Sequence, residues 1–517
     1  MIGGEALVRT LVASGVDVVF ANPGTSEMHF VATLDSVPEM RGVLALFEGA
    51  ATGAADGYAR MRETPAAVLL HLGPGLGNGL ANLHNARRSR APVVAIVGDH
   101  ATYHKPYDAP LESDIETVAR NVSRWIRRSS RPEDAGADAA AAVAAACGPP
   151  GQVATLILPA DVSWSEGGSV AAPAQRSPRA TARPATLADA AAALRSGENA
   201  ALLLGGSALR ERGMRAASRI AGATGAEVLA ETFPARVERG AGIPVIQRLA
   251  YLAEMAAGQL DGLRHLILVD TRAPVSFFAY PGKPSDLVPD GCDVRILAGG
   301  GDDAIAALES LADDLGADGQ PALAAGPRPE KPTGELGAES VARAIGALLP
   351  EGTIVSDEAN TSGTFLPTFT AAAPRHDWLT LTGGSIGQGL PVAVGAAIAC
   401  PDRPVLALEA DGSALYTLQA LWTMAREELD VTTIIFSNRR YAILRMELAR
   451  VGATASGRRA LEMLDLSPPD IDFVALAHGF GVPATRPENA DTFAADLERA
   501  FAEPGPHLIE VVIPSLF

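Results

Sequence analysis

The sequence is poor in cysteine and in basic residues. Its 517 residues include only three cysteines, Cys147, Cys292 and Cys400, which lie far apart and form no CxxC pair. This excludes a disulfide scaffold and a thiolate zinc site, and it fits a reducing compartment. Lys and Arg number 42 against 60 Asp and Glu, which gives a net charge of −18. A chain this acidic repels polyanions, so no nucleic acid is expected as a partner.

Long hydrophobic runs are also lacking. No stretch approaches about 18 uninterrupted apolar residues, so no membrane-spanning helix is expected. The first residues, Met1 to Glu5, have neither the basic start nor the apolar core of a signal peptide. Hydrophobic residues make up 48% and charged residues 20%, which is ordinary globular composition. We therefore expect a cytoplasmic globular protein without a membrane partner.

Two stretches rich in Ala, Pro, Ser and Gly divide the chain. Residues 165–186 and 316–336 show no periodic apolar pattern and are predicted to be exposed linkers. They separate three segments of ordinary domain size, 1–165, 187–315 and 337–517.

Within each segment, short apolar strands alternate with helical patterns. Strands that are apolar on both faces are typical of parallel sheets covered by helices. We therefore predict an α/β protein with three doubly wound domains and parallel central sheets, whose ligands bind at the carboxyl ends of the strands. The predicted strands are 18–21, 43–46, 67–72, 93–97 and 153–158, then 200–204, 227–229, 266–270 and 294–297, then 353–355, 378–381, 405–409, 431–436 and 508–513.

Two oxygen-bearing side chains follow consecutive predicted strands. Asp411 comes after the strand 405–409 and before a predicted helix at 418–428, and Asn438 ends the next strand. One β-α-β crossover separates them, so both emerge at the carboxyl edge of one sheet. Such a pair suits Mg²⁺, which takes oxygen ligands and keeps substrate phosphates in its shell. The alternative is that Asp411 caps the helix and Asn438 closes a turn.

Glu48 is a second candidate. It follows the predicted strand 43–46, opens a helical segment and has only apolar or small neighbours in sequence. A carboxyl group in such a setting can shuttle a proton. The alternative is an ordinary first-turn glutamate that the helix dipole favours.

Two glycine-rich turns, 72–79 and 382–389, also follow strands, and the first comes directly after His71. Neither matches the G-x-G-x-x-G fingerprint, and no Walker A motif occurs. Both turns allow a ligand to approach the backbone, or they are simple tight turns. Residues 383–387 also fit G-x-S-x-G, so a serine hydrolase that uses Ser385 is a rival hypothesis, although nothing fixes its triad partners.

Together these motifs resemble the thiamine-diphosphate-dependent family of 2-oxo acid decarboxylases and acetolactate synthases. The nearest patterns are benzoylformate decarboxylase and acetolactate-synthase-like large subunits. The resemblance implies a pyrimidine-binding domain at 1–165, a central domain at 187–315 and a pyrophosphate-binding domain at 337–517. The matching motifs are 20–25 (FANPGT), Glu48 with its GYAR helix, His71 with GPGLGN, 384–387 (GSIG), and Asp411-Gly412-Ser413 through Asn438.

The resemblance assigns roles to single residues, with thiamine diphosphate and Mg²⁺ as cofactors. Glu48, His71 and Thr25 would be catalytic, and Glu48 would hydrogen-bond the pyrimidine ring. Ile386 would be the apolar wedge that bends the cofactor. Further cofactor contacts would come from Asn360, Thr361, Gly384, Gly412, Ser413 and Tyr441. Mg²⁺ would be bound by Asp411, Asn438 and the backbone carbonyl of Arg440. The substrate pocket would be lined by Leu111, Glu112, Ile443, Leu444 and Glu447.

The resemblance also implies an activity and an assembly. The enzyme would decarboxylate a 2-oxo acid and release an aldehyde, or transfer the acyl carbanion to a second carbonyl of an aldehyde or ketone acceptor. Its active sites would join the first domain of one subunit to the last domain of another, in a homodimer or homotetramer. The central domain carries no dinucleotide fingerprint, which favours an empty domain over one that holds FAD.

The sequence departs from the family pattern at several places. Ala410 replaces the first glycine of the usual G-D-G, and Ser437 replaces the first residue of the usual Asn-Asn pair. Residues 273–280 lack the second histidine of benzoylformate decarboxylase, and the Phe-Gln pair and tryptophan of acetolactate synthases are absent near 110–111 and Glu447. The missing histidine favours carboligation without excluding decarboxylation. It also leaves open a family member that binds the cofactor without turnover.

Overall fold

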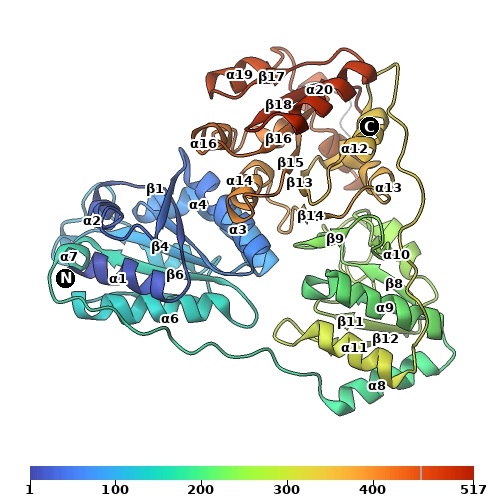
Figure 1. The fold of residues 1–517 in the computed structure, drawn as a ribbon, viewed down its shortest axis with the longest axis horizontal. Coiled ribbons are helices and arrows are strands. Elements are labelled where there is room, and N and C mark those ends of the chain that lie inside the picture. Colours follow the sequence, from blue (N-terminus) through green and yellow to red (C-terminus); the bar gives the residue numbers. More distant parts are fainter. Residues whose placement is uncertain (454–456, 517) are drawn as a thin grey trace.

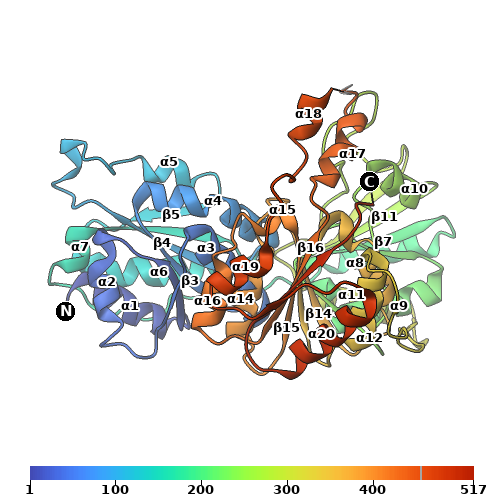
Figure 2. The same cartoon turned by 90° about the horizontal axis from the view of Figure 1, so that it is seen from above.

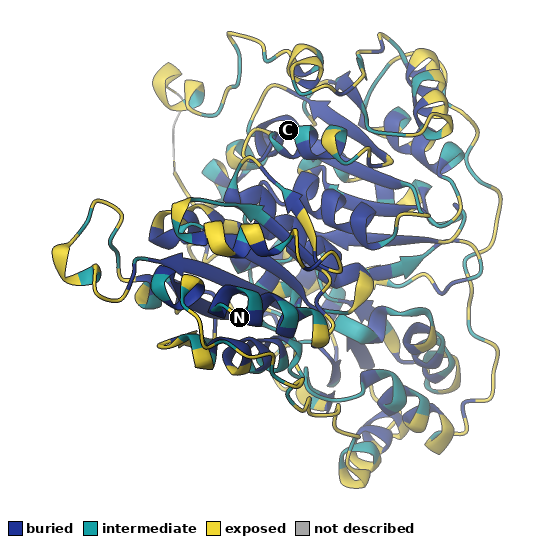
Figure 3. Ribbon diagram, turned by 60° about the vertical axis from the view of Figure 1, so that its left-hand side comes forward, coloured by how far each residue is buried: buried dark blue, intermediate teal, exposed yellow. Residues whose placement is uncertain are grey.

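Three twisted sheets, each built of short parallel strands, follow one another along the chain (Figure 1). The computed structural model describes residues 1–453 and 457–516. Helices lie on the faces of each sheet, and the strands are the most deeply buried part of each unit (Figure 3). This arrangement confirms the predicted fold class. None of the helices in the described part of the chain is both long and apolar enough to cross a bilayer.

The first sheet has the order β2-β1-β3-β4-β6-β5, and all its pairs are parallel. Its strands are β1 (Val18–Asn22), β2 (Arg41–Leu44), β3 (Ala66–Leu70), β4 (Val93–Asp99), β5 (Trp125–Arg128) and β6 (Val153–Pro159). Its helices are α1 (Gly3–Ala13), α2 (Met28–Thr33), α3 (Glu48–Arg62), α4 (Leu72–Ser89), α5 (Ile115–Ala119), α6 (Ala135–Cys147) and α7 (Ala160–Trp164).

The second sheet has the order β10-β8-β7-β11-β12 and is also parallel. Its strands are β7 (Ala200–Leu204), β8 (Glu227–Ala230), β10 (Gln247–Arg248), β11 (His265–Val269) and β12 (Asp293–Ala298). Its helices are α8 (Pro184–Arg195), α9 (Glu211–Thr224), α10 (Ala253–Leu260) and α11 (Ala304–Asp314).

The third sheet has the order β17-β18-β16-β15-β13-β14-β9, and only its edge pair β14–β9 is antiparallel. Its strands are β13 (Ile354–Glu358), β14 (His376–Thr380), β15 (Val405–Ala410), β16 (Val431–Ser437), β17 (Ala484–Thr485), β18 (His507–Val512) and β9 (Val237–Arg239). Its helices are α12 (Ala338–Leu348), α13 (Leu366–Phe369), α14 (Gly389–Ala399), α15 (Asp411–Ala414), α16 (Ala420–Arg426), α17 (Ala442–Arg450), α18 (Arg458–Glu462), α19 (Phe473–Gly479) and α20 (Ala490–Ala502).

Some elements differ from their predicted bounds. The strand predicted at 43–46 is β2, Arg41–Leu44, because the chain already turns at Leu46 and Phe47 into α3. The helix predicted at 418–428 forms only as α16, and the short α15 precedes it. The two predicted linkers run as long connections between the units (Figure 1), except that α8 begins at Pro184, inside the first of them.

Helices α3 and α14 join the first unit to the third (Figure 1). Their backbones cross closely: a Cβ atom on Gly57 would lie 2.2 Å from the carbonyl oxygen of Val392. Beside this crossing, Arg60 is buried, pairs with Asp56 on its own helix, and donates from Nη1 to the carbonyl oxygen of Thr380 at 2.9 Å. The edge of the third sheet is therefore fixed against the first unit.

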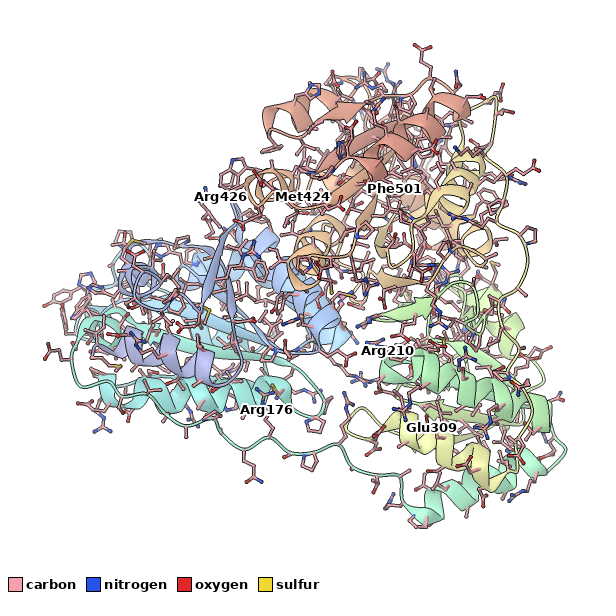
Figure 4. The ribbon with its side chains drawn as sticks, viewed as in Figure 1. Arg176, Arg210, Glu309, Met424, Arg426 and Phe501 are labelled. Carbon is pink, nitrogen blue, oxygen red and sulfur yellow. The ribbon has the colours of Figure 1, made fainter. Side chains whose placement is uncertain are left out.

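The central unit contacts both of the others. Arg210, at the start of α9 (Figure 4), donates from Nη2 to Glu63 Oε1 at 3.0 Å, at the end of α3. β9 belongs to the central segment of the sequence but forms the edge strand of the third sheet, where Val237 pairs with Trp378. Three units with separate sheets are thus held in one arrangement by helix packing and by shared edges.

Candidate functional site

The predicted metal ligands lie at adjacent strand ends of the third sheet. β15 and β16 are parallel neighbours, and Asp411 and Asn438 are the first residues after them. Both side chains are buried. Asp411 Oδ2 accepts the backbone N–H of Arg439 at 2.6 Å, which ties the two strand ends together. The structure therefore brings the Asp411 and Asn438 side chains to one edge.

The oxygen atoms there suit a hard cation. Burial raises the pKa of Asp411 to about 6, although backbone N–H groups of Gly412 and Arg439 bond its carboxylate. An ionised carboxylate in such a place is stabilised by a bound cation. Asn438 Oδ1 accepts the N–H of Arg440 at 3.0 Å, which turns the amide oxygen toward the Arg440 backbone. Carboxylate, amide and backbone carbonyl oxygens together fit Mg²⁺.

Among the described residues there is no side-chain metal cluster of another kind. Within residues 1–453 and 457–516, no group of three or more His, Cys, Asp or Glu side chains could hold an ion. The rings of His100 and His104, four residues apart, contact each other at a tilt of 56°, with centroids 5.3 Å apart. A metal at the edge of the third sheet would therefore need the Asn438 amide oxygen and the Arg440 carbonyl oxygen in addition to the Asp411 carboxylate.

The predicted diphosphate contacts gather at the same edge. β13 pairs with β15, and Asn360 and Thr361 follow β13 in a short 3-10 turn, Asn360–Gly363. Gly412 and Ser413 are buried in α15. A Cβ atom at Gly412 would lie 2.5 Å from Tyr441 Cε1, so the Tyr441 ring packs directly on the Gly412 backbone. These residues come from three adjacent strand ends, as a diphosphate site at the carboxyl edge of a parallel sheet requires.

The buried carboxylate of Glu358 accepts hydrogen bonds from the backbone of the glycine turn 382–389. Glu358, at the end of β13, accepts the N–H groups of Gly387, Gln388 and Gly389 at 2.7, 2.8 and 2.6 Å. Burial raises the pKa of Glu358 to about 7, against the opposing effect of these three hydrogen bonds. Glu358 is not recognisable from the sequence as a site residue, because its partners lie about 30 positions further along the chain.

The same turn lies beside the first unit. Asn82, on α4, donates from Nδ2 to the carbonyl oxygens of Gly49 at 2.8 Å and Gly387 at 3.0 Å. Asn85 donates from Nδ2 to the carbonyl oxygen of Ser385 at 2.8 Å. The start of α3 and the turn that contains Ile386 therefore meet across α4 in a single chain.

Glu48 is the first residue of α3, and its side chain is buried. Its Oε2 accepts a hydrogen bond from Asn78 Nδ2 at 3.0 Å. A Cβ atom on Gly75 would lie 3.3 Å from Glu48 Oε1, so the glycine turn after His71 leaves room for this carboxyl group. A buried carboxyl group with one amide partner can hold or transfer a proton.

His71 has a partner that was not predicted from the sequence. Its Nδ1 lies 2.8 Å from Oε2 of Glu27, which is buried and also accepts the N–H of Gly24. Desolvation raises the pKa of Glu27, and the neighbouring His71 opposes this shift. Because Nδ1 faces the carboxylate, Nε2 points away from it. Thr25 is exposed in the same short turn as Glu27, so His71 and Thr25 lie close together.

The predicted pocket residues separate into two groups. Leu111 is exposed, and Glu112 is paired through Oε1 with Lys105 at 2.5 Å, both in the segment before α5. Ile443, Leu444 and Glu447 are on α17, which stands out from the third unit far from α5 (Figure 2). Glu447 is buried and accepts a hydrogen bond from Tyr251 of the central unit at 3.4 Å. One chain therefore does not bring the two groups together.

A cluster of aromatic rings borders the turn 382–389. Phe277 has its Cζ 2.5 Å from where a Cβ of Gly384 would be. Its ring centroid lies 4.9 Å from Phe278, 5.3 Å from Tyr251 and 5.8 Å from Phe233. Phe277 and Phe278 are 41% and 52% exposed. In a chain with only 5% aromatic residues, this concentration gives the site an apolar border from the central unit.

The geometry gives no support to a serine hydrolase. The hydrogen bonds of Ser385 run through its backbone, to Asn85. In the part of the chain that the structure describes, no histidine or carboxylate hydrogen-bonds the Ser385 hydroxyl. The nearby His84 places Nε2 3.2 Å from the carbonyl oxygen of Gly383 instead. A nucleophilic serine needs a base within hydrogen-bond reach.

Comparison with known proteins identifies the family. Residues 1–119 match the thiamine pyrophosphate enzyme, N-terminal TPP binding domain, and residues 361–511 match the thiamine pyrophosphate enzyme, C-terminal TPP binding domain. A protein of Mycobacterium tuberculosis (strain ATCC 25618 / H37Rv) is 62% identical over 521 residues, and the match covers 100% of both chains. Its name proposes that it is an acetolactate synthase large subunit, IlvX.

Two further proteins agree in length and fold. Benzoylformate decarboxylase of Pseudomonas aeruginosa is 31% identical over 98% of both chains. The solved structure of the Rhodococcus jostii RHA1 thiamine diphosphate-dependent 4-hydroxybenzoylformate decarboxylase superposes with a TM-score of 0.86 over 99% of both chains, at 25% identity. The family resemblance predicted from the motifs is confirmed. The chain belongs to the family of thiamine-diphosphate-dependent enzymes that contains acetolactate synthases and 2-oxo acid decarboxylases.

Proposed function

We propose that the protein is a thiamine-diphosphate- and Mg²⁺-dependent enzyme that decarboxylates a 2-oxo acid. The observation that supports this most is the convergence of Asp411 and Asn438 with the Gly412–Ser413 turn, at the sheet edge that borders the turn of Ile386. When bound, thiamine diphosphate supplies the nucleophilic carbon and the electron sink that decarboxylation needs.

In this proposal the third unit binds the charged end of the cofactor. Asp411, Asn438 and the carbonyl of Arg440 would hold Mg²⁺, which would neutralise the diphosphate. The remaining contacts to the phosphate oxygens come from Asn360, Thr361, Gly412 and Ser413, and Tyr441 covers the Gly412 backbone. Ala410, in place of the usual glycine, lies before this turn with an ordinary extended backbone, φ −79° and ψ 148°, so its methyl group causes no backbone strain.

In this proposal the first unit supplies the side chains that hold or donate protons. Glu48 would hold a proton at the pyrimidine ring of the bound cofactor, and the side chain of Ile386 with the Gly384 carbonyl would orient that ring. His71, oriented by Glu27, presents Nε2 to the reacting carbon of the substrate, and Thr25 lies beside it. At this position His71 would be the general acid for release of an aldehyde product. Without a second histidine, transfer of the acyl group to an aldehyde or ketone acceptor would compete with release of the aldehyde.

The test is CO₂ release from a panel of 2-oxo acids, with product identification by NMR. Pyruvate, benzoylformate, phenylpyruvate and branched-chain acids are assayed with Mg²⁺ and thiamine diphosphate, with and without an aldehyde acceptor. Glu48→Gln should lower turnover by at least about 100-fold while the cofactor still binds. Glu5→Gln, at another first-turn glutamate, on α1, is the matched control and should retain wild-type turnover. Near-normal activity of Glu48→Gln would disprove its role.

The product decides between the two finer activities. An aldehyde as the main product means decarboxylase, and a hydroxyketone with added acceptor means carboligase. Binding of the cofactor by calorimetry without product from any donor would favour the alternative, a family member that binds thiamine diphosphate without turnover.

A further inference from the structure

Two buried glutamates lie side by side and pack against the turn that contains Ile386. Glu358 at the end of β13 is the register partner of Glu409 in β15. Glu358 is only 2% exposed and Glu409 is 0% exposed. Neither forms an ion pair with Lys, Arg or His in the described residues. Glu358 instead accepts backbone N–H groups, and Glu409 lies against the carboxylates of Glu358 and Asp357. Two buried acids without a cation are costly, so their place in the fold needs a reason.

Glu358 holds the backbone directly after Ile386. Its Oε1 accepts the N–H of Gly387 at 2.7 Å, and Oε2 accepts those of Gln388 and Gly389 at 2.8 and 2.6 Å. Gly387 has φ of +91°, a conformation that other residues rarely adopt. Three consecutive N–H groups thus converge on one carboxylate, and hydrogen bonds to an ionised acceptor are the stronger kind.

Glu409 connects this turn to the predicted diphosphate site. A Cβ atom on Gly389 would lie 1.9 Å from Glu409 Oε1 and 3.0 Å from the Cβ of Glu358, so both glutamates pack on Gly389. Ser413 donates from Oγ to Glu409 Oε2 at 3.4 Å. The turn that holds Ile386 and the turn that holds Ser413 therefore rest on the same pair of carboxyl groups.

We propose that Glu358 is a positioning residue that sets the turn 384–389, and with it Ile386, in its cofactor-binding shape before thiamine diphosphate arrives. Glu409 links this turn to the turn of Ser413, so that both halves of the cofactor site are fixed together. The inference rests on the proposed function, because Ile386 has this role only if the cofactor binds there.

Hydrogen exchange on the full-length wild-type chain tests the inference without any turnover. In the cofactor-free protein, the amides of Gly387, Gln388 and Gly389 should exchange slowly, since each donates to a buried carboxylate. Little further slowing should follow when Mg²⁺ and thiamine diphosphate are added. Fast exchange of these amides that becomes slow only after cofactor addition would overturn the proposal.

Variants give the second readout. Glu358→Gln keeps the size of the side chain but leaves one acceptor oxygen for three donors. Exchange of the three amides should accelerate, and the affinity for thiamine diphosphate, measured by calorimetry, should fall at least about tenfold. Glu358→Asp retains the charge and should recover part of the affinity. Ser356→Ala removes the 2.8 Å hydrogen bond to the carbonyl of Gly389 and is the control, with the exchange of Gly387 and Gln388 unchanged.

The outcomes separate this inference from the proposed function. Wild-type protein that binds thiamine diphosphate, together with Glu358→Gln that binds equally well, would disprove the positioning role alone. Wild-type protein that fails to bind the cofactor would disprove the proposed function and, with it, the role given to Ile386. Weakened binding by Glu358→Gln with faster exchange at 387–389 supports both.

Discussion

At the scale of single residues, the proposed role of Asp411 as a metal ligand would link cofactor binding to pH. Burial raises the pKa of this carboxyl group to about 6, so its ionised form is costly in the folded protein. A group whose pKa is raised by folding stabilises the fold at low pH, and this contribution is lost as the pH rises through about 6. A bound Mg²⁺ reverses that loss, because the cation interacts only with the ionised form.

The rise in melting temperature caused by Mg²⁺ with thiamine diphosphate should therefore be large near pH 7.5 and small near pH 5, as measured by scanning fluorimetry. Asp411→Ala should abolish the rise at both values. Asp402→Ala, at an exposed turn after α14, is the control and should keep it. A rise of equal size at both values in the wild type would contradict the assignment of Asp411 as a ligand.

The residues that sequence analysis could find share one property: each directly follows a strand within a local motif. Asp411, Asn438 and His71 were recognisable in this way. Glu27 and Glu358 were not, because a carboxylate that supports a site is defined by its partner. Glu27 meets His71 across 44 positions, and Glu358 meets Gly387 across 29. Only the fold shows such pairs.

At the scale of elements, the crossing of α3 and α14 depends on small residues. A Cβ atom at Gly395 would lie 1.9 Å from the carbonyl oxygen of Ala54, and one at Gly57 would lie 2.2 Å from that of Val392. Gly395→Ala must therefore push the helices apart, and we expect it to destabilise the protein by about 1–3 kcal/mol. The melting temperature in the absence of cofactor measures this.

The matched control is Gly222→Ala. Gly222 lies on an exposed turn of α9, and nothing lies within 4 Å of an added Cβ atom. Alanine there should leave stability unchanged or raise it by about 0.5–1 kcal/mol, since it favours the helix. Equal effects of the two substitutions would show that helix propensity, and not the close approach of α3 and α14, governs stability at Gly395.

The segment after β11 carries the aromatic border of the site, and it predicts the preferred substrate. Phe277 packs on Gly384 and is the centre of a cluster with Tyr251 and Phe278. We expect 2-oxo acids with aromatic or large apolar side chains to be better substrates than pyruvate. Phe277→Ala should lower the ratio of kcat/KM for benzoylformate to that for pyruvate by about tenfold.

The control for this prediction is Trp164→Ala, at a half-exposed ring on α7. It should leave the ratio unchanged. A ratio that favours pyruvate in the wild type, and that does not respond to Phe277→Ala, would show that the cluster serves only to pack the central unit against the third.

Two strands, β5 and β9, were not predicted from the sequence. β5 (Trp125–Arg128) is basic and half-exposed, so it lacks the apolar run that marked the other strands of its sheet. β9 (Val237–Arg239) is three residues long and is a strand only because β14 lies beside it, more than a hundred positions away. The strands that were predicted have an apolar run in their sequence, whether they are central like β4 and β15 or lie at an edge like β12.

At the scale of the whole molecule, a single chain leaves large apolar side chains exposed beside the site. Leu46 is 43% exposed two residues before Glu48, and Leu415 and Tyr416 are 40% and 53% exposed just after Ser413. Exposed apolar groups at such a position are typical of a surface that another subunit covers. We propose a homodimer or homotetramer, which light scattering after gel filtration measures directly.

Mixing two inactive variants tests whether the subunits share their sites. Suppose that each site combines Glu48 of one subunit with Asp411 of its neighbour. A dimer of one Glu48→Gln chain and one Asp411→Ala chain then holds one site with both defects and one site with neither. After unfolding or dissociation and reassembly of an equal mixture, half of the dimers are mixed, so about one quarter of the wild-type activity should return.

If both residues of a site came from the same chain, every site in the mixture would carry a defect and no activity would return. Mixing Glu48→Gln with Glu48→Gln is the control for reassembly alone. The bond from Asn82 to both Gly49 and Gly387 places the start of α3 near the turn of Ile386 within one chain, so proximity by itself does not decide between the two arrangements. Complementation decides it, because only a site shared between subunits can combine two intact halves from two defective chains.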